Sequence, residues 1–460
     1  MLLPSLCLLW AYVPGLASDV PSPNVLMIAI DDLNDWVGCL GGHPDVKTPN
    51  IDALAQRGRN FTNAHCVVPV CSPSRVSIMS GLSPTTHGSY ELGPSYQSIR
   101  RLDKVPCLQE YFKKHGYLTI AGGKVLHHGF RGRLAKAIDV TLGTRRGGPR
   151  PKNQMNWPVR VWDWGPYPQT DKEMFDDQLA QRAASALKKR YDKPFFLSIG
   201  FFRPHVPMFV PPKWFKLYDP KKITLPKAPR EDMKDIPLNF QNLKQIAPTH
   251  ADVLKAGKWR SLVHAYLAST SFVDACVGKV IQALDNGPNK KSTIVVLWSD
   301  HGFHLGEKQH WAKRTLWEES TRVPFIFAGR DILKSGDCRE AVSLLDVYPT
   351  LVEMCGLPRN KQLEGLSLVP QLKDPTATRK QPALTSSYFG NHAVRSRDWR
   401  YIRYADGAEE LYDHRTDPEE RSNLAKDPRH QKIKASLAGW LPKKAVPEVK
   451  KRSEQKKRKK

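Results

Sequence analysis

One cysteine at the start of an expected helix carries the most reactive chemistry in this sequence. It lies in the run Cys71-Ser72-Pro73-Ser74-Arg75. Ser72 is predicted to cap the helix and Pro73 to be its first residue. A group just before a helix N-terminus faces free N–H donors, and Arg75 adds more, so this position suits an anionic ligand. The alternative is a buried structural cysteine beside a capped helix.

Carboxylates follow two of the expected strands. Asp31 and Asp32 come directly after the apolar run 24–30, and Asp300 and His301 come shortly after the run 293–298. Adjacent carboxylates in an apolar setting are unfavourable unless a cation compensates them. Because open α/β sheets bind ligands at the carboxyl ends of their strands, these groups are expected to share one site. The alternative makes Asp300 a helix cap and His301 a loop residue.

Three further strands and two long helices complete the pattern. The strands are expected at 117–121, 194–201 and 323–327, and the helices at 174–190 and 260–284. Lys124 and His127 follow the first of these strands, and His205 follows the second. Alternating strands and helices predict an α/β fold with a large, mostly parallel sheet flanked by helices.

The charge balance favours anionic partners. The chain of 460 residues has 71 Lys and Arg against 45 Asp and Glu, a net charge of +26. The last twenty residues hold ten of the basic residues and two Glu, so most of the excess lies in the body. Sulfated glycans, nucleic acids and anionic membranes are the corresponding partner classes. Specific nucleic-acid binding is not expected, because the Lys-rich end has no interleaved aromatic residues.

The N-terminal end predicts export. Residues 1–17 have an apolar core and a small-residue cleavage site at Gly15-Leu16-Ala17, typical of a signal peptide, although no basic residue precedes the core. A misassigned start or a buried first strand is the alternative. No later apolar run approaches the length of a membrane span. The eight cysteines do not have the spacing of a zinc site, and their disulfide pairing, if any, cannot be deduced from the sequence.

The pattern of apolar and polar residues changes near residue 370. A partly alternating segment at 393–404, a turn at Asp406-Gly407, a second short strand at 410–413 and a helix near 430–440 predict a small antiparallel α+β subdomain. The expected domains are therefore a catalytic domain at 18–370, a C-terminal subdomain at 371–441 and a basic disordered tail at 442–460.

From residue 24 to about 424 the chain resembles the formylglycine-dependent sulfatases, and most closely their iduronate-2-sulfatase-like branch. The matching motifs are Cys-x-Pro-Ser-Arg at 71–75, Gly-Lys-Val-Leu-His at 123–127, Arg-Pro-His at 203–205, Asp-His-Gly at 300–302, Leu-Gly-Glu at 305–307 and Trp-Ala-Lys at 311–313. The C-terminal segment also resembles the sulfatase C-terminal subdomain. The resemblance implies the alkaline-phosphatase-like sulfatase fold and hydrolysis of sulfate esters.

The resemblance also implies a nucleophile and a metal. A maturation enzyme would oxidise Cys71 to formylglycine, whose hydrate attacks sulfur. Calcium would be held by Asp31, Asp32, Asp300 and His301 and would bind an oxygen at position 71. Three carboxylates are suitable calcium ligands, whereas a histidine is less typical.

The remaining roles are implied in the same way. Arg75 and Lys124 would hold the hydrate, unless they are ordinary surface cations. His127 would take the proton of the second hydroxyl, although the neighbouring His128 is an alternative. His205 and Lys313 would bind the sulfate, and one of them would protonate the leaving alcohol.

The substrate is expected to be a sulfated carbohydrate. Trp157, Trp162 and Trp164 cluster in a loop-like segment with Arg160, where indoles could stack on sugar rings and the guanidinium could bind an anionic group. Packing of the indoles as a lid over the core is the alternative.

Two other functions compete. A phosphatase or phosphodiesterase of the same superfamily would use Thr, Ser or unmodified Cys, usually with two zinc ions. A secreted polyanion-binding protein with an inactive site would bind normally after Cys71→Ala and release no sulfate.

Overall fold

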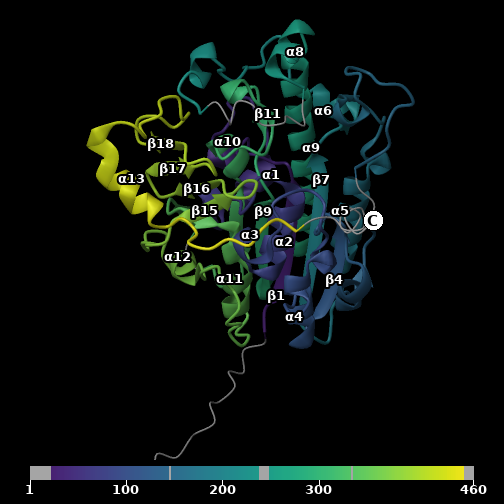
Figure 1. The fold of residues 1–460 in the computed structure, drawn as a ribbon. Helices are drawn as coiled ribbons and strands as arrows, with labels where there is room; N and C mark the ends of the chain where they lie inside the picture. The colour runs from purple at the N-terminus through teal and green to yellow at the C-terminus, as the bar shows by residue number, and fades with distance from the viewer. Residues whose placement is uncertain (1–21, 145–146, 238–247, 333–334, 450–460) are drawn as a thin grey trace, which may run out of the picture.

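An eight-stranded sheet forms the centre of the molecule (Figure 1). The computed structural model describes residues 22–144, 147–237, 248–332 and 335–449, so the expected signal peptide and residues 450–460 of the expected tail lie outside the described residues. The strands lie in the order β13 (Gly336–Cys338), β2 (Arg59–Phe61), β12 (Phe325–Gly329), β9 (Thr293–Ser299), β1 (Asn24–Asp31), β7 (Phe195–Pro204), β4 (Leu118–Gly123) and β5 (Val140–Thr141).

Helices cover both faces of this sheet, and three two-stranded pairs lie beside it. The helices are α1 (Pro49–Gln56), α2 (Cys71–Ser80), α3 (Pro84–His87), α4 (Leu108–Lys114), α5 (Phe175–Leu187), α6 (Pro212–Phe215), α8 (His250–Lys255), α9 (Trp259–Asp285), α10 (Glu318–Thr321), α11 (Val347–Met354), α12 (Val369–Lys373) and α13 (Gln431–Ala438). The pairs are β10 (His304–Leu305) with β11 (Trp311–Ala312), β14 (Val342–Ser343) with β3 (Ala64–His65), and β6 (Trp164–Pro166) with β8 (Met208–Val210).

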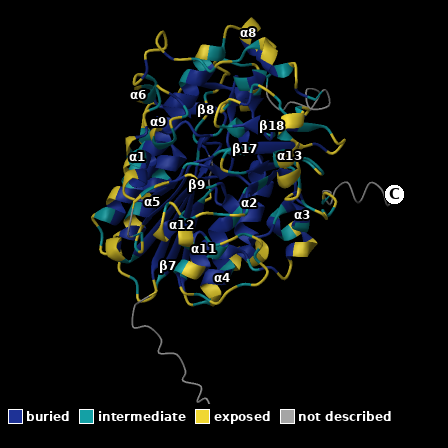
Figure 2. Cartoon of the chain, turned by 90° about the vertical axis from the view of Figure 1, so that its left-hand side faces the viewer, coloured by how far each residue is buried: buried dark blue, intermediate teal, exposed yellow. Residues whose placement is uncertain are grey.

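Strand β1 explains the layered architecture. All eight of its residues are buried, and successive side chains of a strand point to opposite faces. Its odd-numbered residues from Val25 to Ala29 pack with α2, α4 and α11, and its even-numbered residues from Leu26 to Ile30 pack with α1, α5 and α9. In Figure 2 the strands and α2 are dark blue, whereas exposed residues lie at the periphery. A strand buried on both faces requires the continuous apolar run seen in the sequence.

The predicted fold class is confirmed. β1 pairs in parallel with β7 and β9, and β4 pairs in parallel with β7 and β5. β12 is antiparallel to both β9 and β2, which makes the sheet mixed. The two long predicted helices correspond to α5 and α9, and all five predicted strands are present.

Helix α9 is long and apolar enough to cross a membrane by length and composition. It is the one such helix in the described part of the chain, and 78% of its most apolar 18-residue window is buried inside the fold. It packs against α5, β7 and α1, so its apolar residues belong to the core.

The C-terminal sheet is a four-stranded antiparallel meander. It contains β15 (Ala383–Ser386), β16 (His392–Arg395), β17 (Trp399–Arg403) and β18 (Glu409–Asp413), with the predicted Asp406-Gly407 turn between the last two strands. The predicted boundary near residue 370 falls within α12.

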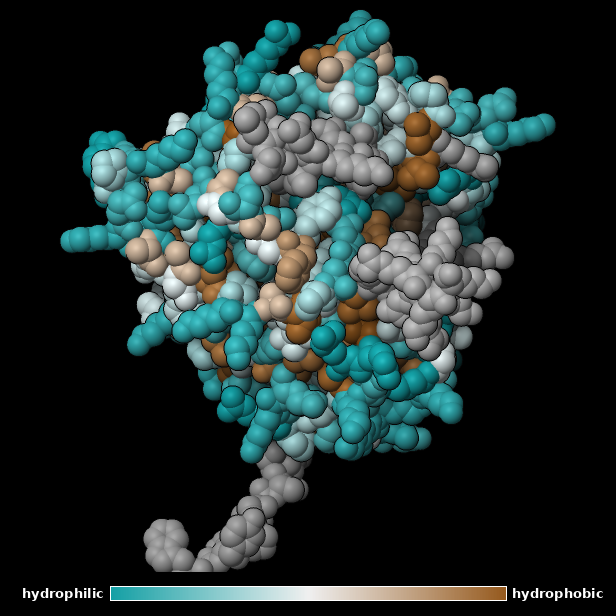
Figure 3. Space-filling view, viewed as in Figure 1, coloured by the Kyte–Doolittle hydropathy of each residue, from teal (hydrophilic) through white to brown (hydrophobic). Residues whose placement is uncertain are grey.

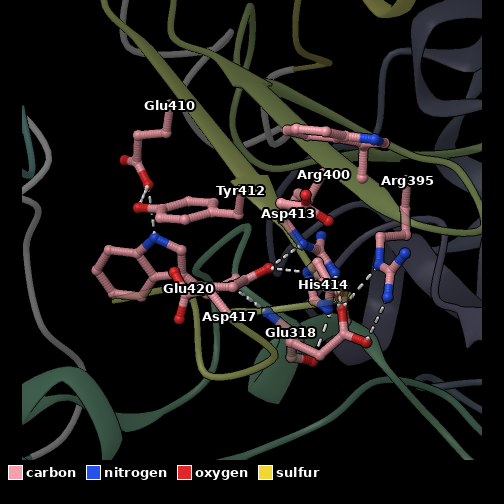
Figure 4. Close-up of polar contacts among 12 residues, drawn as sticks. Glu318, Arg395, Arg400, Glu410, Tyr412, Asp413, His414, Asp417 and Glu420 are labelled. Carbon is pink, nitrogen blue, oxygen red and sulfur yellow. Dashed lines mark hydrogen bonds and ion pairs between the residues drawn. The ribbon is translucent and has the colours of Figure 1, made fainter. Parts of the chain in front are cut away.

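A buried charged network joins this C-terminal sheet to α10 (Figure 4). Glu318 of α10 forms ion pairs with Arg395 and Arg400, and Arg400 also pairs with Glu420. His414 Nε2 lies 2.9 Å from a Glu420 oxygen, and the Glu318 N–H donates to the other oxygen of Glu420. The side chains of Arg400 and Glu420 are at most 1% exposed, so each charge depends on its partners.

This network predicts that the protein loses stability in acid. Burial raises the pKa of Glu318, but the charges of Arg395, His414 and Arg400 outweigh it and hold that pKa well below the ordinary value. The ionised carboxylate therefore stabilises the fold above its ordinary pKa, and this contribution disappears as pH falls through the lower folded-state pKa. Glu318→Gln is expected to reduce the free energy of unfolding at pH 7 by about 3 kcal/mol and to flatten the loss of stability on acidification.

Thermal unfolding at neutral and acidic pH measures both effects. The matched control is Glu353→Gln, because Glu353 is an exposed carboxylate on α11. Equal melting temperatures of the Glu318→Gln variant and the parent protein at pH 7 would contradict the structural role of the network.

Candidate active site

Cys71 is the first residue of α2, so the helix begins two positions earlier than predicted. Val70 is the N-cap, with an extended backbone and no side-chain cap. The Ser72 hydroxyl donates instead to the Pro94 carbonyl, 3.2 Å away, so the predicted capping role of Ser72 is wrong. The helix ends at Gly81, whose left-handed backbone (φ 69°) lets its N–H donate to the Ser77 carbonyl. Every residue of α2 is buried, which places the thiol at the bottom of the site.

The two consecutive carboxylates at the end of β1 reach the same site through an unusual backbone. In a regular strand, neighbouring side chains point to opposite faces. The pairing of β1 with β7 shifts register between Ile30 and Asp31, and Asp32 has a positive φ of 60°, which is uncommon for a residue other than glycine. The Asp32 N–H donates to Asp300 Oδ1 at 3.1 Å, and Tyr266 of α9 donates its hydroxyl to the Asp32 carbonyl at 2.7 Å.

The predicted nucleophile and ligands converge on one sulfur atom. Cys71 Sγ lies 3.1 Å from His301 Nε2, 3.1 Å from Lys313 Nζ and 3.6 Å from Asp32 Oδ1. This cysteine belongs to two sets of potential ligand atoms. Within each set, all ligand atoms lie within 4.8 Å of one another. They are Asp31, Asp32, Cys71 and His205 in one set and Cys71, Asp300 and His301 in the other.

Arg75 and Lys124 compensate the buried carboxylates. Arg75 Nε lies 2.7 Å from Asp300 Oδ2, and its Nη2 lies 3.1 Å from Asp31 Oδ1. Its third nitrogen donates to the Lys124 and Val125 carbonyls. The Lys124 ammonium pairs with Asp31. Burial raises the pKa of Asp31, but the charges of Lys124, His205 and Arg75 outweigh it and lower this pKa. Arg75 therefore positions two carboxylates with two of its nitrogens and binds backbone carbonyls with the third.

Two histidines present Nε2 to the centre of the site. His205 Nδ1 lies 2.5 Å from the Val206 carbonyl, and His301 Nδ1 lies 2.9 Å from the Gly302 carbonyl. A carbonyl accepts a hydrogen bond, so Nδ1 carries a proton in each ring and Nε2 faces the centre of the site. His205 Nε2 lies 3.8 Å from Asp32 Oδ2 and 4.0 Å from Asp31 Oδ2. The sequence did not predict that His205 would lie at ligand distance from both carboxylates.

The surroundings of Cys71 activate it. Burial raises the pKa of its thiol, but Lys124, Lys313 and His301 outweigh burial and lower that pKa well below its ordinary value. Burial lowers the pKa of His127 and outweighs the same thiol and the charge of Asp31, which raise that pKa. The imidazole is therefore neutral and able to accept a proton.

Lys313 reaches the site from a strained loop. Its ammonium lies 2.6 Å from Asp32 Oδ1, and its side chain is 6% exposed. Lys308, Gln309, Ala312 and Arg314 all have positive φ values. Backbone strain of this kind persists only where surrounding structure enforces it, and here it directs the ammonium inward.

The tryptophan cluster lies in the core. Trp162 and Trp164 are 6% and 2% exposed and pack in an apolar cluster with Trp36 and Tyr266. Trp157 is half-buried and stacks on Trp164 at 6.2 Å between ring centroids. The structure favours the packing alternative for these indoles, because buried rings offer no face to a sugar. The side chain of Arg160 lies outside what the structure describes.

A cavity of about 1170 Å³ adjoins the site. Ser72, Leu126 and His127 line its inner part, next to the nucleophile, and Arg100, Arg101 and Arg131 line it further out. These three arginines belong to none of the motifs identified in the sequence, so they were not predicted to lie near the site. The seven described cysteines are all free thiols, so no disulfide constrains the cavity or the described fold.

The carboxylates fit a hard divalent cation. Asp32 Oδ2 is buried, and no hydrogen-bond donor reaches it within the described part of the chain. Burial lowers the pKa of His301, but Asp300 and other anionic groups outweigh burial and raise it to about 9. The excess of negative charge thus retains a proton on this ring, and a divalent cation would supply the same compensation.

Comparisons with known proteins give the same family along the chain. The sulfatase family model matches residues 23–357, and the model described as N-sulphoglucosamine sulphohydrolase, C-terminal, matches residues 306–446. A sulfatase of Formosa agariphila is 39% identical over 447 residues, which cover 92% of this chain and 87% of that protein. Human iduronate 2-sulfatase is 29% identical over 414 residues, which cover 78% of this chain and 73% of that protein.

A solved structure of a 2-O GAG sulfatase matches with a TM-score of 0.70 at 25% identity, covering 91% of this chain and 90% of that chain. The mixed sheet with polar groups gathered at the carboxyl ends of its strands defines an alkaline-phosphatase-like enzyme of ester hydrolysis. The chain belongs to the sulfatase family and is a sulfuric ester hydrolase, which confirms the predicted family.

Proposed function

We propose that this enzyme hydrolyses sulfate esters of an anionic carbohydrate through a formylglycine formed from Cys71 and a calcium ion. The observation that carries the proposal is the convergence on Cys71 Sγ. Three carboxylates, three histidines and two lysines lie around one buried thiol at a helix N-terminus. Ordinary structural cysteines do not require such a concentration of charge.

Asp31, Asp32, Asp300 and His301 would hold the calcium ion. Carboxylate oxygens are the ligands that calcium prefers, and Asp32 Oδ2 is available to it. Bound calcium would draw charge from the sulfuryl group and favour ionisation of the attacking hydroxyl. Arg75 and Lys124 form ion pairs with Asp31, and Arg75 also pairs with Asp300, which holds these carboxylates in place.

A hydrated formylglycine at position 71 would supply an attacking hydroxyl and a second hydroxyl whose deprotonation expels sulfate. His127 would accept that second proton, because burial lowers its pKa and its imidazole interacts with the side chain of residue 71. His205 and Lys313 lie beside Asp32, where they would bind sulfate oxygens. One of the two would donate a proton to the alcohol as its bond to sulfur breaks.

The substrate class rests on charge and on the relatives. Iduronate 2-sulfatase and the 2-O GAG sulfatase act on sulfated sugars by name. The body of the chain is basic even without its tail, which favours capture of a polyanion. A maturation enzyme that oxidises Cys71 would be the required partner, and export after removal of residues 1–17 would place the enzyme where such glycans occur.

The test is release of inorganic anion from matched esters. We expect sulfate from desalted glycosaminoglycan fragments at a higher kcat/KM than from an aryl sulfate, and no phosphate from the corresponding phosphate monoester or diester. Faster phosphate release would favour a phosphatase of the same fold. Tight binding of the fragments with no release of either anion would favour an inactive polyanion-binding protein.

A further inference from the structure

Arg314 follows Lys313 in the chain and has a backbone conformation that arginine rarely adopts. Its φ is 88°, in the left-handed region that is unfavourable for a residue with a Cβ. The Lys313 ammonium lies 3.1 Å from Cys71 Sγ and 2.6 Å from Asp32 Oδ1. A lysine side chain is long and flexible, so the direction of its backbone decides where the ammonium can reach. Contacts that hold Arg314 in this conformation therefore also hold Lys313.

The backbone of Arg314 is bound to two distant parts of the chain. Its N–H donates to the Pro69 carbonyl at 3.1 Å, two residues before Cys71. Its carbonyl accepts a hydrogen bond from the Ser387 hydroxyl at 2.6 Å, just after β15. Arg314 is thus attached on one side to the segment that leads into α2 and on the other side to the C-terminal sheet.

The guanidinium of Arg314 is held by a second pair of contacts. Its Nη1 forms an ion pair with Glu91 and lies 3.2 Å from the Tyr388 hydroxyl oxygen. Its Cζ lies 5.5 Å from the centre of the Tyr388 ring, which is a cation–π distance. Tyr388 also has a positive φ, of 56°. Glu91 and Tyr388 therefore form a clamp around the guanidinium, and such backbone strain persists only where surrounding structure enforces it.

Residues 446–449, at the end of the described chain, fix the segment that leads to Glu91. The Val446 N–H donates to the Thr85 carbonyl at 2.8 Å. The Val449 N–H donates to the Gly88 carbonyl at the same distance. In Figure 1 this yellow segment runs across α3 and α2, and in Figure 3 hydrophilic side chains predominate over the face that it crosses. Glu91 is therefore only three residues from a backbone that is bound at Gly88.

Tyr90 connects the two halves of the clamp. Its hydroxyl donates to the Val446 carbonyl at 3.1 Å. Its ring contacts the ring of Phe389 edge to face, with 5.7 Å between centroids. Tyr90 precedes Glu91, and Phe389 follows Tyr388, so the two clamp residues come from segments that pack on each other.

We propose that Arg314, held by Glu91 and Tyr388, is a positioning residue that fixes the Lys313 ammonium beside residue 71. The inference rests on the proposed function, in which Lys313 binds a sulfate oxygen. Arg314 acts on the reaction only through its neighbour, because its own contacts are to the clamp and to backbone groups. Displacing a reacting group by about 1 Å can lower a rate about a hundredfold, so a clamp that fixes a flexible lysine has a large effect.

The first experiment is a double-mutant cycle on sulfate release from an aryl sulfate. Arg314→Ala is expected to lower kcat/KM about a hundredfold, and Lys313→Ala is expected to lower it further. In the double variant, the change at Arg314 should add a factor of about three or less to the loss from Lys313→Ala, because the side chain that it positions is already absent. Arg314→Lys keeps the charge but lacks the fixed guanidinium fork, so it should regain only part of the rate.

Glu91→Gln tests the clamp without a change at Arg314. It is expected to lower kcat/KM about tenfold, and this loss should also disappear in the Lys313→Ala background. The control is Arg379→Ala, which removes a similarly buried guanidinium whose Nη2 lies 2.8 Å from Asp346 Oδ2. The melting temperature of this control is expected to fall, while its kcat/KM stays within a few-fold of the parent value.

A kcat/KM of Arg314→Ala equal to that of the parent protein would overturn the proposal. Full additivity in the double variant would also overturn it, because Arg314 would then act independently of Lys313. A loss in Arg379→Ala as large as that in Arg314→Ala would have the same consequence, since any buried ion pair would then matter equally.

A second readout does not depend on catalysis. A crystal structure of the full-length Arg314→Ala variant is expected to show the Lys313 ammonium displaced by about 1 Å or more from its place beside Cys71, whereas in Arg379→Ala it should not move. Displacement, without sulfate release by the parent protein from any ester, would refute the proposed function and leave the positioning role intact. Sulfate release by the parent protein, with an undisplaced ammonium in Arg314→Ala, would do the reverse.

Discussion

Cys71→Ala is expected to reduce sulfate release by a factor on the order of 10⁴ or more, because loss of a covalent nucleophile removes the main reaction path. The thiol is 1% exposed, and alanine is smaller, so the fold should persist. Cys71→Ser is expected to lose activity to a similar degree. Its single hydroxyl can be sulfated, but it has no second hydroxyl with which to expel sulfate.

Cys276→Ala is the matched control, because Cys276 is also buried at 1% exposure but lies within α9. Its kcat should stay within a few-fold of the parent value, while its melting temperature falls. If Cys71→Ser retained the parent rate, a hydroxyl nucleophile of the phosphatase type would explain the site better than formylglycine.

Asp31→Ala is expected to remove bound calcium and activity together. Asp31 forms ion pairs with Arg75 and Lys124 and lies near His205. Its removal leaves these cations without their carboxylate, and their positive charge then repels a divalent ion. Elemental analysis and sulfate release on the same preparation measure both losses. Added calcium should restore little activity, because a ligand itself is missing.

Asp274→Asn serves as the control for the Asp31 variant. Asp274 is a buried carboxylate of α9 that accepts hydrogen bonds from the Asn50 and Ile51 N–H groups at the start of α1, so this variant should keep its calcium. Stoichiometric zinc in the parent protein, with activity that survives calcium chelation, would contradict the assignment and favour the phosphatase alternative.

Sequence patterns were sufficient to predict a strand wherever that strand is buried on both faces. The run that forms β1 is apolar without interruption, and its end at Asp31 marked the site because parallel strands bring their carboxyl ends together. The orientation of β12 was not predictable, because strand direction depends on the path of the connecting chain. The short strands β2 and β5 were not predicted, because two or three residues are too few to show the alternating pattern of a strand.

Long-range contacts account for the other differences. Arg400 and Glu318 are 82 positions apart in the sequence, and nothing local marks them as partners. Trp162 was singled out for its type, but its 6% exposure depends on distant residues such as Phe303. The binding of Val446 and Val449 to α3 had no sequence signal, because the neighbouring lysines indicate a solvated tail. The roles assigned to individual site residues remain predictions.

The mass of the peptide that contains Cys71, taken from enzyme of measured specific activity, tests the central claim most directly. Formylglycine replaces the thiol by an aldehyde oxygen, and the account predicts that the converted fraction rises in proportion to specific activity across preparations made with different amounts of the maturing enzyme. A fully active preparation whose peptide carries only the unmodified thiol would contradict it.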